Sequence, residues 1–312
     1  MKKIFGLASV ALVCAGALVL LEWPSSSVDL LLCDVGQGDA ILITSGFTQI
    51  LVDGGQNDAV LECIGEHIPY WDRHIELVIA THADADHIGG LVSVLKNYHV
   101  REIWDNGQFS AKDTAVAADF AALVASQVSV GSRSIAATSG DGFAAADKKI
   151  IAQVLAPSRG GQSVTESTIG DSETTLSDKT MEKAEGIGDT NNGSIVLLLE
   201  LSKVLVLLTG DIELEGELAL LSSGLIPDVH ILKVAHHGAK TSSSHDFLEK
   251  SRPEIALIGV GEKNKFGHPA PEVIDRLKQL NAVIVRTDQD GTVKFRLENG
   301  EIASSVLEEP LK

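Results

Sequence analysis

Four side chains that can bind a metal ion lie within six residues of the chain: His82, Asp84, Asp86 and His87. They follow Thr81 and a largely apolar run, 75–80, in which Glu76 is the one charged residue, and we expect this run to form a strand buried on both faces. Carboxylates this close together would repel one another unless a cation lay between them. A helix cap by Asp86 is the simpler alternative, but it accounts for only one of the four residues. The segment therefore predicts a metal-dependent site at the end of a strand.

The same arrangement recurs at three other points of the sequence. Apolar runs end at Asp53, at Asp211 and at the pair His236 and His237. Taken singly, Asp211 could cap a helix and the histidine pair could be structural. Because functional groups are common where strands give way to loops, we expect these segments to meet in one site. Hydrolysis by a metal-held hydroxide needs such converging imidazoles and carboxylates, with one coordination position left for water.

The rest of the chain alternates short apolar runs, turn signals and helical periodicities. Strands are predicted over 28–35, 40–43, 50–52, 75–80, 100–104, 148–155, 194–201, 204–208, 229–234, 255–258 and 283–286, with a closing hairpin around 299–300. Helices are predicted over 58–67, 88–98, 114–127, 214–221, 244–250 and 272–280. This order suits a mixed α and β protein in which two sheets pack face to face with helices outside.

The composition indicates a globular protein. Of 312 residues, 44% are hydrophobic and only 4% are aromatic, which allows a sizeable aliphatic core and excludes global disorder. The formal net charge of -18 argues against a large surface dedicated to nucleic acid, so a phosphate-rich substrate would need local positive charge. We expect one catalytic domain over 28–312, with appendages.

Two segments differ from this domain. Residues 1–27 begin with Lys2 and Lys3, continue with an uncharged stretch over 4–21 and end in polar residues, which is typical of a signal peptide or an uncleaved membrane anchor. We therefore expect an extracytoplasmic protein, whether periplasmic, secreted or tethered to the membrane. Residues 157–192 are rich in Ser, Thr, Gly and acidic residues, which indicates a flexible insertion.

The cysteines suggest neither a framework of disulfides nor a thiolate zinc site. There are three of them, and Cys14 lies in the leader, so at most one pair remains in the body of the protein. We expect Cys33 and Cys63 to be small buried hydrophobic residues.

The metal-binding segment resembles the H-x-H-x-D-H signature of the metallo-β-lactamase superfamily, with Asp84 in place of the second histidine. More closely, the chain resembles the β-lactamase-like domain of the ComEC DNA-uptake proteins. The stretches that carry this resemblance are 34–40 (DVGQGDA), 81–91 (THADADHIGGL), 208–211 (LTGD), 232–242 (LKVAHHGAKTS) and 264–269 (NKFGHP). The resemblance extends from about residue 28 to 290. It implies a four-layer αββα sandwich with one or two divalent metal ions at the sheet edge.

The resemblance also implies roles for individual residues. The implied metal ligands are His82, Asp84, Asp86, His87, Asp211 and His236. The first two would hold one ion, the next two a second, and Asp211 would bridge them, with a histidine of the 236–237 pair or His268 completing the second position. The implied catalytic residues are Asp86, His237 and His268. The residues implied to orient ligands or contact substrate are Asp53, Asn192, Lys240 and Lys265.

The chain departs from the superfamily pattern at two ligands. Asp84 stands where a second histidine is common, and the further histidine expected near residue 194 is replaced by Asp189, Asn191 and Asn192. Oxygen atoms are harder ligands than imidazole nitrogens. The site should therefore favour manganese or magnesium over zinc more than the sites of relatives with complete histidine sets do. Zinc and manganese are the metals that we expect.

The implied function is a hydrolase in which a metal-held hydroxide attacks phosphorus or an acyl carbon. Lys233, Lys240, Lys263 and Lys265 form a local group of positive charge that could receive a phosphodiester, and ordinary surface charge explains them equally well. The leading hypothesis is an exported phosphodiesterase or nuclease-like enzyme with a small-molecule or nucleic-acid substrate. The alternatives are a hydrolase of esters, lactones or amides on the same site, and a binding module that has lost turnover. We infer no obligate protein partner, and we expect membrane contact only through the N-terminal segment.

Overall fold

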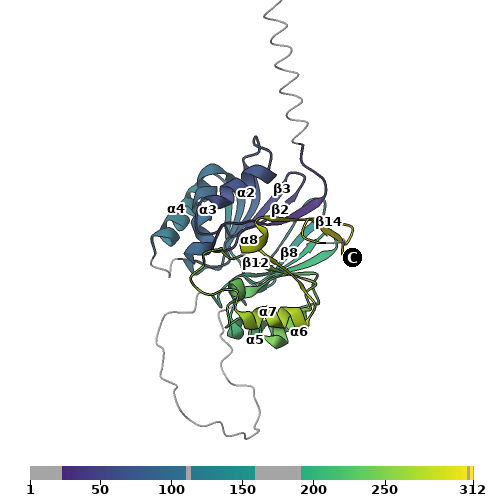
Figure 1. Cartoon of the computed structure of the whole chain (residues 1–312). Helices are drawn as coiled ribbons and strands as arrows, with labels where there is room; N and C mark the ends of the chain where they lie inside the picture. The colour runs from purple at the N-terminus through teal and green to yellow at the C-terminus, as the bar shows by residue number, and fades with distance from the viewer. Residues whose placement is uncertain (1–22, 110–113, 159–190, 308–309, 312) are drawn as a thin grey trace, which may run out of the picture.

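Two β-sheets packed face to face form the centre of the molecule, and helices cover their outer faces (Figure 1). The computed structural model describes residues 23–109, 114–158, 191–307 and 310–311. The four-layer αββα sandwich expected from the sequence is confirmed.

Among the described residues, the first sheet has eight strands. In spatial order they are β15 (Glu301–Ser304), β14 (Val293–Glu298), β1 (Val28–Leu32), β2 (Ile41–Ser45), β3 (Thr48–Val52), β4 (His74–Ile79), β5 (His99–Asp105) and β6 (Arg133–Ala136). Pairing is antiparallel from β15 to β3 and parallel from β3 to β6. Parallel neighbours need crossover connections, which here contain α2 (Ala59–His67), α3 (Ala85–Asn97) and α4 (Ala115–Ser129).

The second sheet is built from seven strands of the described chain. In spatial order they are β13 (Val283–Arg286), β12 (Ile255–Ile258), β11 (Ile231–Lys233), β10 (Val204–Leu208), β9 (Val196–Leu201), β8 (Ile150–Ala156) and β7 (Gly142–Ala144). Its parallel part, from β13 to β10, is connected through α5 (Leu214–Ser223), α6 (His245–Ser251) and α7 (Pro271–Gln279). A short 3-10 helix, η2 (Ala235–Gly238), follows β11, and α8 (Thr287–Asp290) follows β13.

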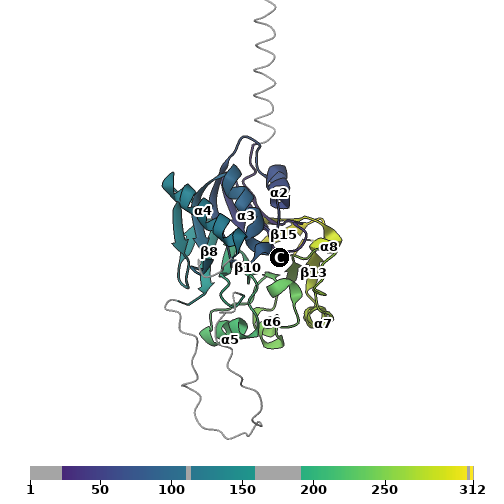
Figure 2. The same cartoon turned by 90° about the vertical axis from the view of Figure 1, so that its left-hand side faces the viewer.

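Apolar side chains fill three layers between these elements. Leu30 and Leu32 of β1 belong to the layer between the sheets, whereas Leu31 belongs to the layer beneath α2, α3 and α4. The third layer lies between the second sheet and α5, α6 and α7. Figure 2 shows the two groups of helices on opposite sides of the strands. Successive side chains of a strand point to opposite faces, so strands buried on both faces have continuous apolar sequences.

Local signals set the limits of several helices. The Thr114 side chain caps α4 by accepting a hydrogen bond from the Ala117 amide, and Ser244 caps α6 in the same way from the Phe247 amide. Gly224 ends α5 in the left-handed conformation, with φ 69°, which glycine adopts without steric cost.

Most predicted elements are present, with ends that differ by a few residues. The helix expected over 88–98 begins earlier, at Ala85, and therefore contains Asp86 and His87 in its first turn. The strands β6 and β7 were not predicted, because they are short and largely exposed and lack an alternating apolar pattern.

The predicted leader, 1–27, and the predicted insertion, 157–192, fall largely outside the described residues. Within the ranges that the structure describes, no helix has the length and apolar character needed to cross a membrane.

Cys33 and Cys63 form a disulfide, which corrects the expectation that they are simply buried hydrophobic residues. Both are buried, at 1% and 5% exposure, but they bond the end of β1 to α2. The sequence could not show this pairing, because it does not reveal which face of α2 packs against β1.

Candidate metal centre

Polar side chains that follow four strands meet at one edge of the sandwich. Asp53 follows β3, His82 follows β4, Asp211 follows β10 and His237 follows β11. All four are buried, with at most 3% of their surface exposed. The first turn of α3 adds His87, which is fully buried. Four strand ends and the first turn of α3 thus deliver imidazoles and carboxylates to one place.

Two groups of potential ligand atoms share His87. In one group, ligand atoms of His82, His87 and Asp211 lie within 4.8 Å of one another, and in the other, those of Asp86, His87 and His237 do so. Asp211 Oδ2 lies 3.2 Å from His87 Nε2 and 3.3 Å from His237 Nε2. Asp86 Oδ2 lies 3.4 Å from His237 Nε2. Asp211 therefore stands between the two groups.

The imidazole nitrogens that face this point fit a cation. The Nε2 atoms of His82, His87 and His237 are buried, and none of them makes a well-oriented hydrogen bond within the described part of the chain, although those of His87 and His237 lie close to Asp211 Oδ2. Leaving a buried polar atom unsatisfied costs about 1–3 kcal/mol. One or two divalent ions held by these nitrogens together with Asp211 and Asp86 would satisfy all three, with ligand types that zinc and manganese accept.

Asp53 fixes the His87 ring from behind. Its Oδ2 accepts a hydrogen bond from His87 Nδ1 at 2.8 Å and another from the Thr81 hydroxyl at 2.7 Å, and its Oδ1 accepts from the Thr81 amide at 2.8 Å. Because an ionised carboxylate can only accept, Nδ1 of His87 carries a proton and Nε2 is directed toward Asp211. Thr81 Oγ1 also lies 3.0 Å from His82 Nδ1, so one hydroxyl contacts both the Asp53 carboxylate and the His82 ring.

Asp39 and Lys233 form a buried ion pair beside the centre. Asp39 Oδ1 lies 3.4 Å from His237 Nδ1, an ionic contact that lacks the hydrogen-bond geometry of Asp53 with His87. Lys233 Nζ also lies 3.8 Å from Asp211 Oδ1. Burial alone would raise the pKa of Asp39, but the charges of Lys233 and His237 outweigh it and hold that pKa below its usual value. The lysine thus keeps a carboxylate ionised inside the protein.

The three buried histidines differ in protonation state when no cation is bound. Burial, and then the charge of His87, lowers the pKa of His82 to about 3. Burial would also lower the pKa of His87 and His237, but nearby carboxylates outweigh it. Asp211 and Asp53 raise the pKa of His87 well above the usual imidazole value. Asp211 and Asp39 do the same for His237. At neutral pH His82 is therefore neutral, while the other two rings are protonated.

Backbone contacts tie the ligand-bearing segments together. The Gly54 amide donates to the His87 carbonyl at 2.7 Å, and the Gly90 amide donates to the Gly55 carbonyl at 2.9 Å. A Cβ atom at Gly90 would lie 1.9 Å from the Gly54 carbonyl oxygen, so no larger residue fits. The start of α3 and the loop after β3 are therefore fixed relative to each other, main chain against main chain.

The two adjacent histidines point to different places. His236 and His237 both have a left-handed backbone, with φ 50° and 54°. His237 reaches Asp86 and Asp211, whereas His236 Nδ1 lies 3.1 Å from Glu213 Oε1. The structure thus brings His237, which we expected to be catalytic, among the ligand atoms, and leaves the predicted ligand His236 beside them.

The solvent side of the centre is formed by side chains that are partly exposed. Asp84 Oδ1 lies 3.9 Å from His82 Nε2, and the Asp84 side chain is 32% exposed. The rings of His236 and His268 have centroids 5.6 Å apart. Burial, and then the charge of His236, lowers the pKa of His268 below the usual imidazole value. His268 is therefore neutral at neutral pH and able to accept a proton.

The remaining predicted site residues lie further out. Asn192 Oδ1 accepts hydrogen bonds from the amides of Glu213 and Gly216, so this side chain holds the start of α5. Lys240 is exposed and pairs with Glu272 at 3.1 Å, and Lys265 is exposed. None of these three residues is in the groups of ligand atoms found among the described residues.

A family model described as the metallo-beta-lactamase superfamily matches residues 33–262. The chain belongs to this superfamily. ComE operon protein 3 of Bacillus subtilis (strain 168) is 26% identical over 314 residues, which cover 92% of this chain and 35% of the relative. Recombination protein 2 of Haemophilus influenzae is 28% identical over 282 residues, which cover 88% of this chain and 29% of the relative. These matches confirm the resemblance to the ComEC-type competence proteins, and the chain spans about a third of the length of these curated relatives.

A solved structure with a similar arrangement is the metallo-beta-lactamase fold protein YhfI from Bacillus subtilis. It is 12% identical, has a TM-score of 0.46, and the match covers 83% of this chain and 95% of that one.

Two residues beside the ligands, Lys233 and Asp39, were not predicted from the sequence to belong to the site. Lys233, grouped above with the possible surface lysines, is 1% exposed, which corrects that interpretation. A signal was present, because a single charge within the apolar run 231–235 needs a partner if the strand is buried. Asp39 is part of the quoted stretch 34–40, but nothing in the sequence places it opposite β11.

Proposed function

We propose that this chain is an exported, metal-dependent phosphodiesterase that acts on a nucleic acid or a nucleotide-containing substrate. The observation that supports it best is the convergence of three unsatisfied, buried imidazole nitrogens on Asp211. When bound, a divalent ion would supply Lewis acidity and would lower the pKa of a coordinated water.

The residues around the ligands prepare this site in advance. Asp53 holds the His87 ring by a hydrogen bond, and Asp39 lies in ionic contact with the His237 ring, so each ring has a carboxylate behind it before a ligand binds. Lys233 offsets part of the negative charge contributed by Asp39 and Asp211. His268, neutral and on the solvent side, is the residue that we assign to accept a proton during the reaction.

The loop between β12 and α7 supports a phosphodiester rather than a small ester as the substrate. Lys263 and Lys265 are exposed on it, and Phe266 between them and His268 is 70% exposed. The rings of Phe266 and His268 are stacked, with centroids 5.8 Å apart and an angle of 13° between their planes. Cations that contact phosphate and aromatic rings that stack on bases are the usual means of binding single strands. The name of one relative, Recombination protein 2, agrees with a nucleic-acid substrate.

Export is supported by the disulfide between Cys33 and Cys63. Disulfides persist in oxidising compartments such as the periplasm and are rare in the cytosol. Together with the uncharged stretch over 4–21 that follows two lysines, the disulfide favours a protein that is secreted or tethered outside the cytoplasm.

The test is an activity screen beside a measurement of metal content. We would incubate the full chain with manganese, magnesium or zinc and supply single-stranded DNA, a bis-aryl phosphate, an aryl ester and a lactone. We expect turnover of the phosphodiesters. The Asp211→Ala and His87→Ala variants should lose both metal and turnover, with little change in the circular dichroism spectrum.

A matched control is His74→Ala, because His74 is exposed and lies at the other end of β4 from His82. It should keep metal and activity. Turnover of esters or lactones without phosphodiester cleavage would replace the proposed substrate class. Bound metal with no turnover of any substrate would favour a binding module, and full activity of Asp211→Ala would refute the ligand assignment.

A further inference from the structure

Exposed aromatic side chains gather at the end of the sandwich that is opposite the metal centre. Trp23 is 59% exposed, Phe47 is 45% exposed and Tyr70 is 59% exposed. The rings of Trp23 and Phe47 have centroids 5.4 Å apart, and those of Phe47 and Trp71 are 5.8 Å apart. We refer to these four residues as the aromatic cluster. Phe266 is the one other large aromatic side chain exposed to this degree among the described residues.

Three separate segments build the aromatic cluster. Trp23 precedes β1, Phe47 lies in the turn between β2 and β3, and Tyr70 and Trp71 precede β4. The candidate metal ligands and their supports follow the other ends of β3 and β4. These strands contain five and six residues, which at about 3.3 Å per residue separates the two ends by roughly 17–20 Å. The aromatic cluster and the metal centre therefore face in opposite directions.

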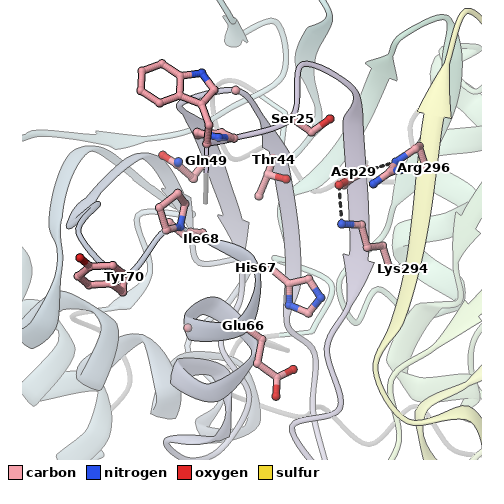
Figure 3. A pocket seen from close by; sticks show the side chains of 15 residues that line it. Ser25, Asp29, Thr44, Gln49, Glu66, His67, Ile68, Tyr70, Lys294 and Arg296 are labelled. Carbon is pink, nitrogen blue, oxygen red and sulfur yellow. Dashed lines mark hydrogen bonds and ion pairs between the residues drawn. The ribbon is translucent and has the colours of Figure 1, made fainter. Parts of the chain in front are cut away.

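A hollow of about 300 Å³ adjoins the aromatic cluster (Figure 3). In this view Tyr70 lies on one side of it, and Lys294 and Arg296 lie on the other. Both cations are partly exposed and pair with the buried Asp29, at 2.6 Å and 3.2 Å, while Glu66 is exposed at the same hollow. Aromatic rings at headgroup level, near basic side chains, are typical of surfaces that contact membranes.

We propose that the aromatic cluster lies in the headgroup region of a lipid bilayer and holds the domain with its metal centre facing away from the membrane. The uncharged stretch over 4–21 is close to the roughly 20 residues that span a bilayer, and it ends two residues before Trp23. A tether alone leaves the domain free to rotate. Contacts at Phe47 and Tyr70, far from the tether in sequence, fix its orientation. The proposal rests on the tethered form of the exported protein proposed above, and it is independent of the hydrolytic reaction.

Quenching of tryptophan emission by brominated lipid tests this orientation. The chain has three tryptophans, and Trp104 is 1% exposed within the core, where bromine cannot reach it. In a full chain that carries Trp23→Phe, Trp71 is then the reporter. We would reconstitute this protein in vesicles of phosphatidylcholine and phosphatidylglycerol, with and without bromine on the acyl chains. We expect emission from Trp71 to be lost in the brominated vesicles.

Two further variants in the Trp23→Phe background decide the interpretation. Phe47→Ser combined with Tyr70→Ser removes exposed rings only, so it should fold, still sediment with the vesicles and recover the Trp71 emission. Phe266→Ser, an equally exposed aromatic at the other end, should remain quenched. Unquenched Trp71 in the parent protein, or equal quenching after the double substitution, would overturn the proposal. Failure of every form to sediment with vesicles would overturn the membrane attachment itself, whereas phosphodiester hydrolysis in solution reports separately on the proposed function.

Discussion

Binding of a divalent ion to this centre should release protons, because the ion takes positions that protons now hold. His87 Nε2 lies 3.2 Å from Asp211 Oδ2, and His237 Nε2 lies 3.3 Å from the same oxygen. The pKa of both imidazoles is raised well above the usual value, so both are charged at neutral pH. An imidazole binds a metal only in its neutral form, through the nitrogen that gives up its proton. Each of the two rings must therefore lose one proton.

The number of protons released sets how steeply the metal affinity depends on pH. His82 contributes no proton, because its pKa is lowered to about 3. Asp211 contributes none either, because the charges of His237 and His87 outweigh burial and hold its pKa well below the usual value. Two released protons make the metal affinity rise by about a hundredfold per pH unit, which is about 2.7 kcal/mol. The rise should continue until the pH exceeds the raised pKa of each ring.

Titration calorimetry of manganese binding between pH 6 and 8, in buffers of different ionisation enthalpy, measures the number of protons directly. We expect about two protons to be released in total when the centre of the wild-type chain is filled. His237→Ala should lower this number by one. His82→Ala, which also removes one imidazole, should weaken binding but leave the number unchanged. A metal affinity that is flat over this pH range, or equal proton numbers for the two variants, would refute the assignment of charge to these histidines.

Three further predictions concern the surroundings of the centre. The Cys33→Ser substitution removes a disulfide between residues 30 apart, so the free energy of unfolding in urea should fall by about 3.6 kcal/mol. Dithiothreitol should lower the stability of the wild type by the same amount and should have no effect on the variant. Asp53→Asn should weaken metal binding by about 10–100-fold in a competition assay with a fluorescent chelator, because the carboxylate that orients His87 is lost, while unchanged affinity would contradict that role. Asp84→His should shift the preference from manganese toward zinc in the same assay, because an imidazole replaces an oxygen donor 3.9 Å from His82, and an unchanged preference would show that residue 84 does not bind the metal.

The positions of the site segments could be predicted because they follow apolar strands. Asp53, His82 and Asp211 each come directly after such a run, and a sheet brings strand ends together whatever the details of packing. The largely apolar run before His82 also predicted a strand buried on both faces, which β4 confirms except at the exposed His74 and the half-buried Glu76.

The side-chain directions within those segments could not be predicted. His236 and His237 are adjacent and chemically identical, and both have a left-handed backbone, so no local signal distinguishes the one that faces Asp211. Lys233 has a partner only because β11 lies opposite the loop that contains Asp39, which is a tertiary relation without a local signal. The disulfide was missed for the same reason, since Cys33 and Cys63 lie on different elements.

Gly54 and Gly90 meet without intervening side chains, so the spacing of the ligands depends on main-chain shape and not on the identity of neighbouring side chains. The outer part of the loop between β12 and α7, residues 262–267, is by contrast mostly exposed. In the proposed function this loop contacts the substrate, so its residues can change without displacing the metal ligands beneath it. Anyone who wishes to redirect the protein to a new substrate should randomise 262–267 and leave both glycines untouched.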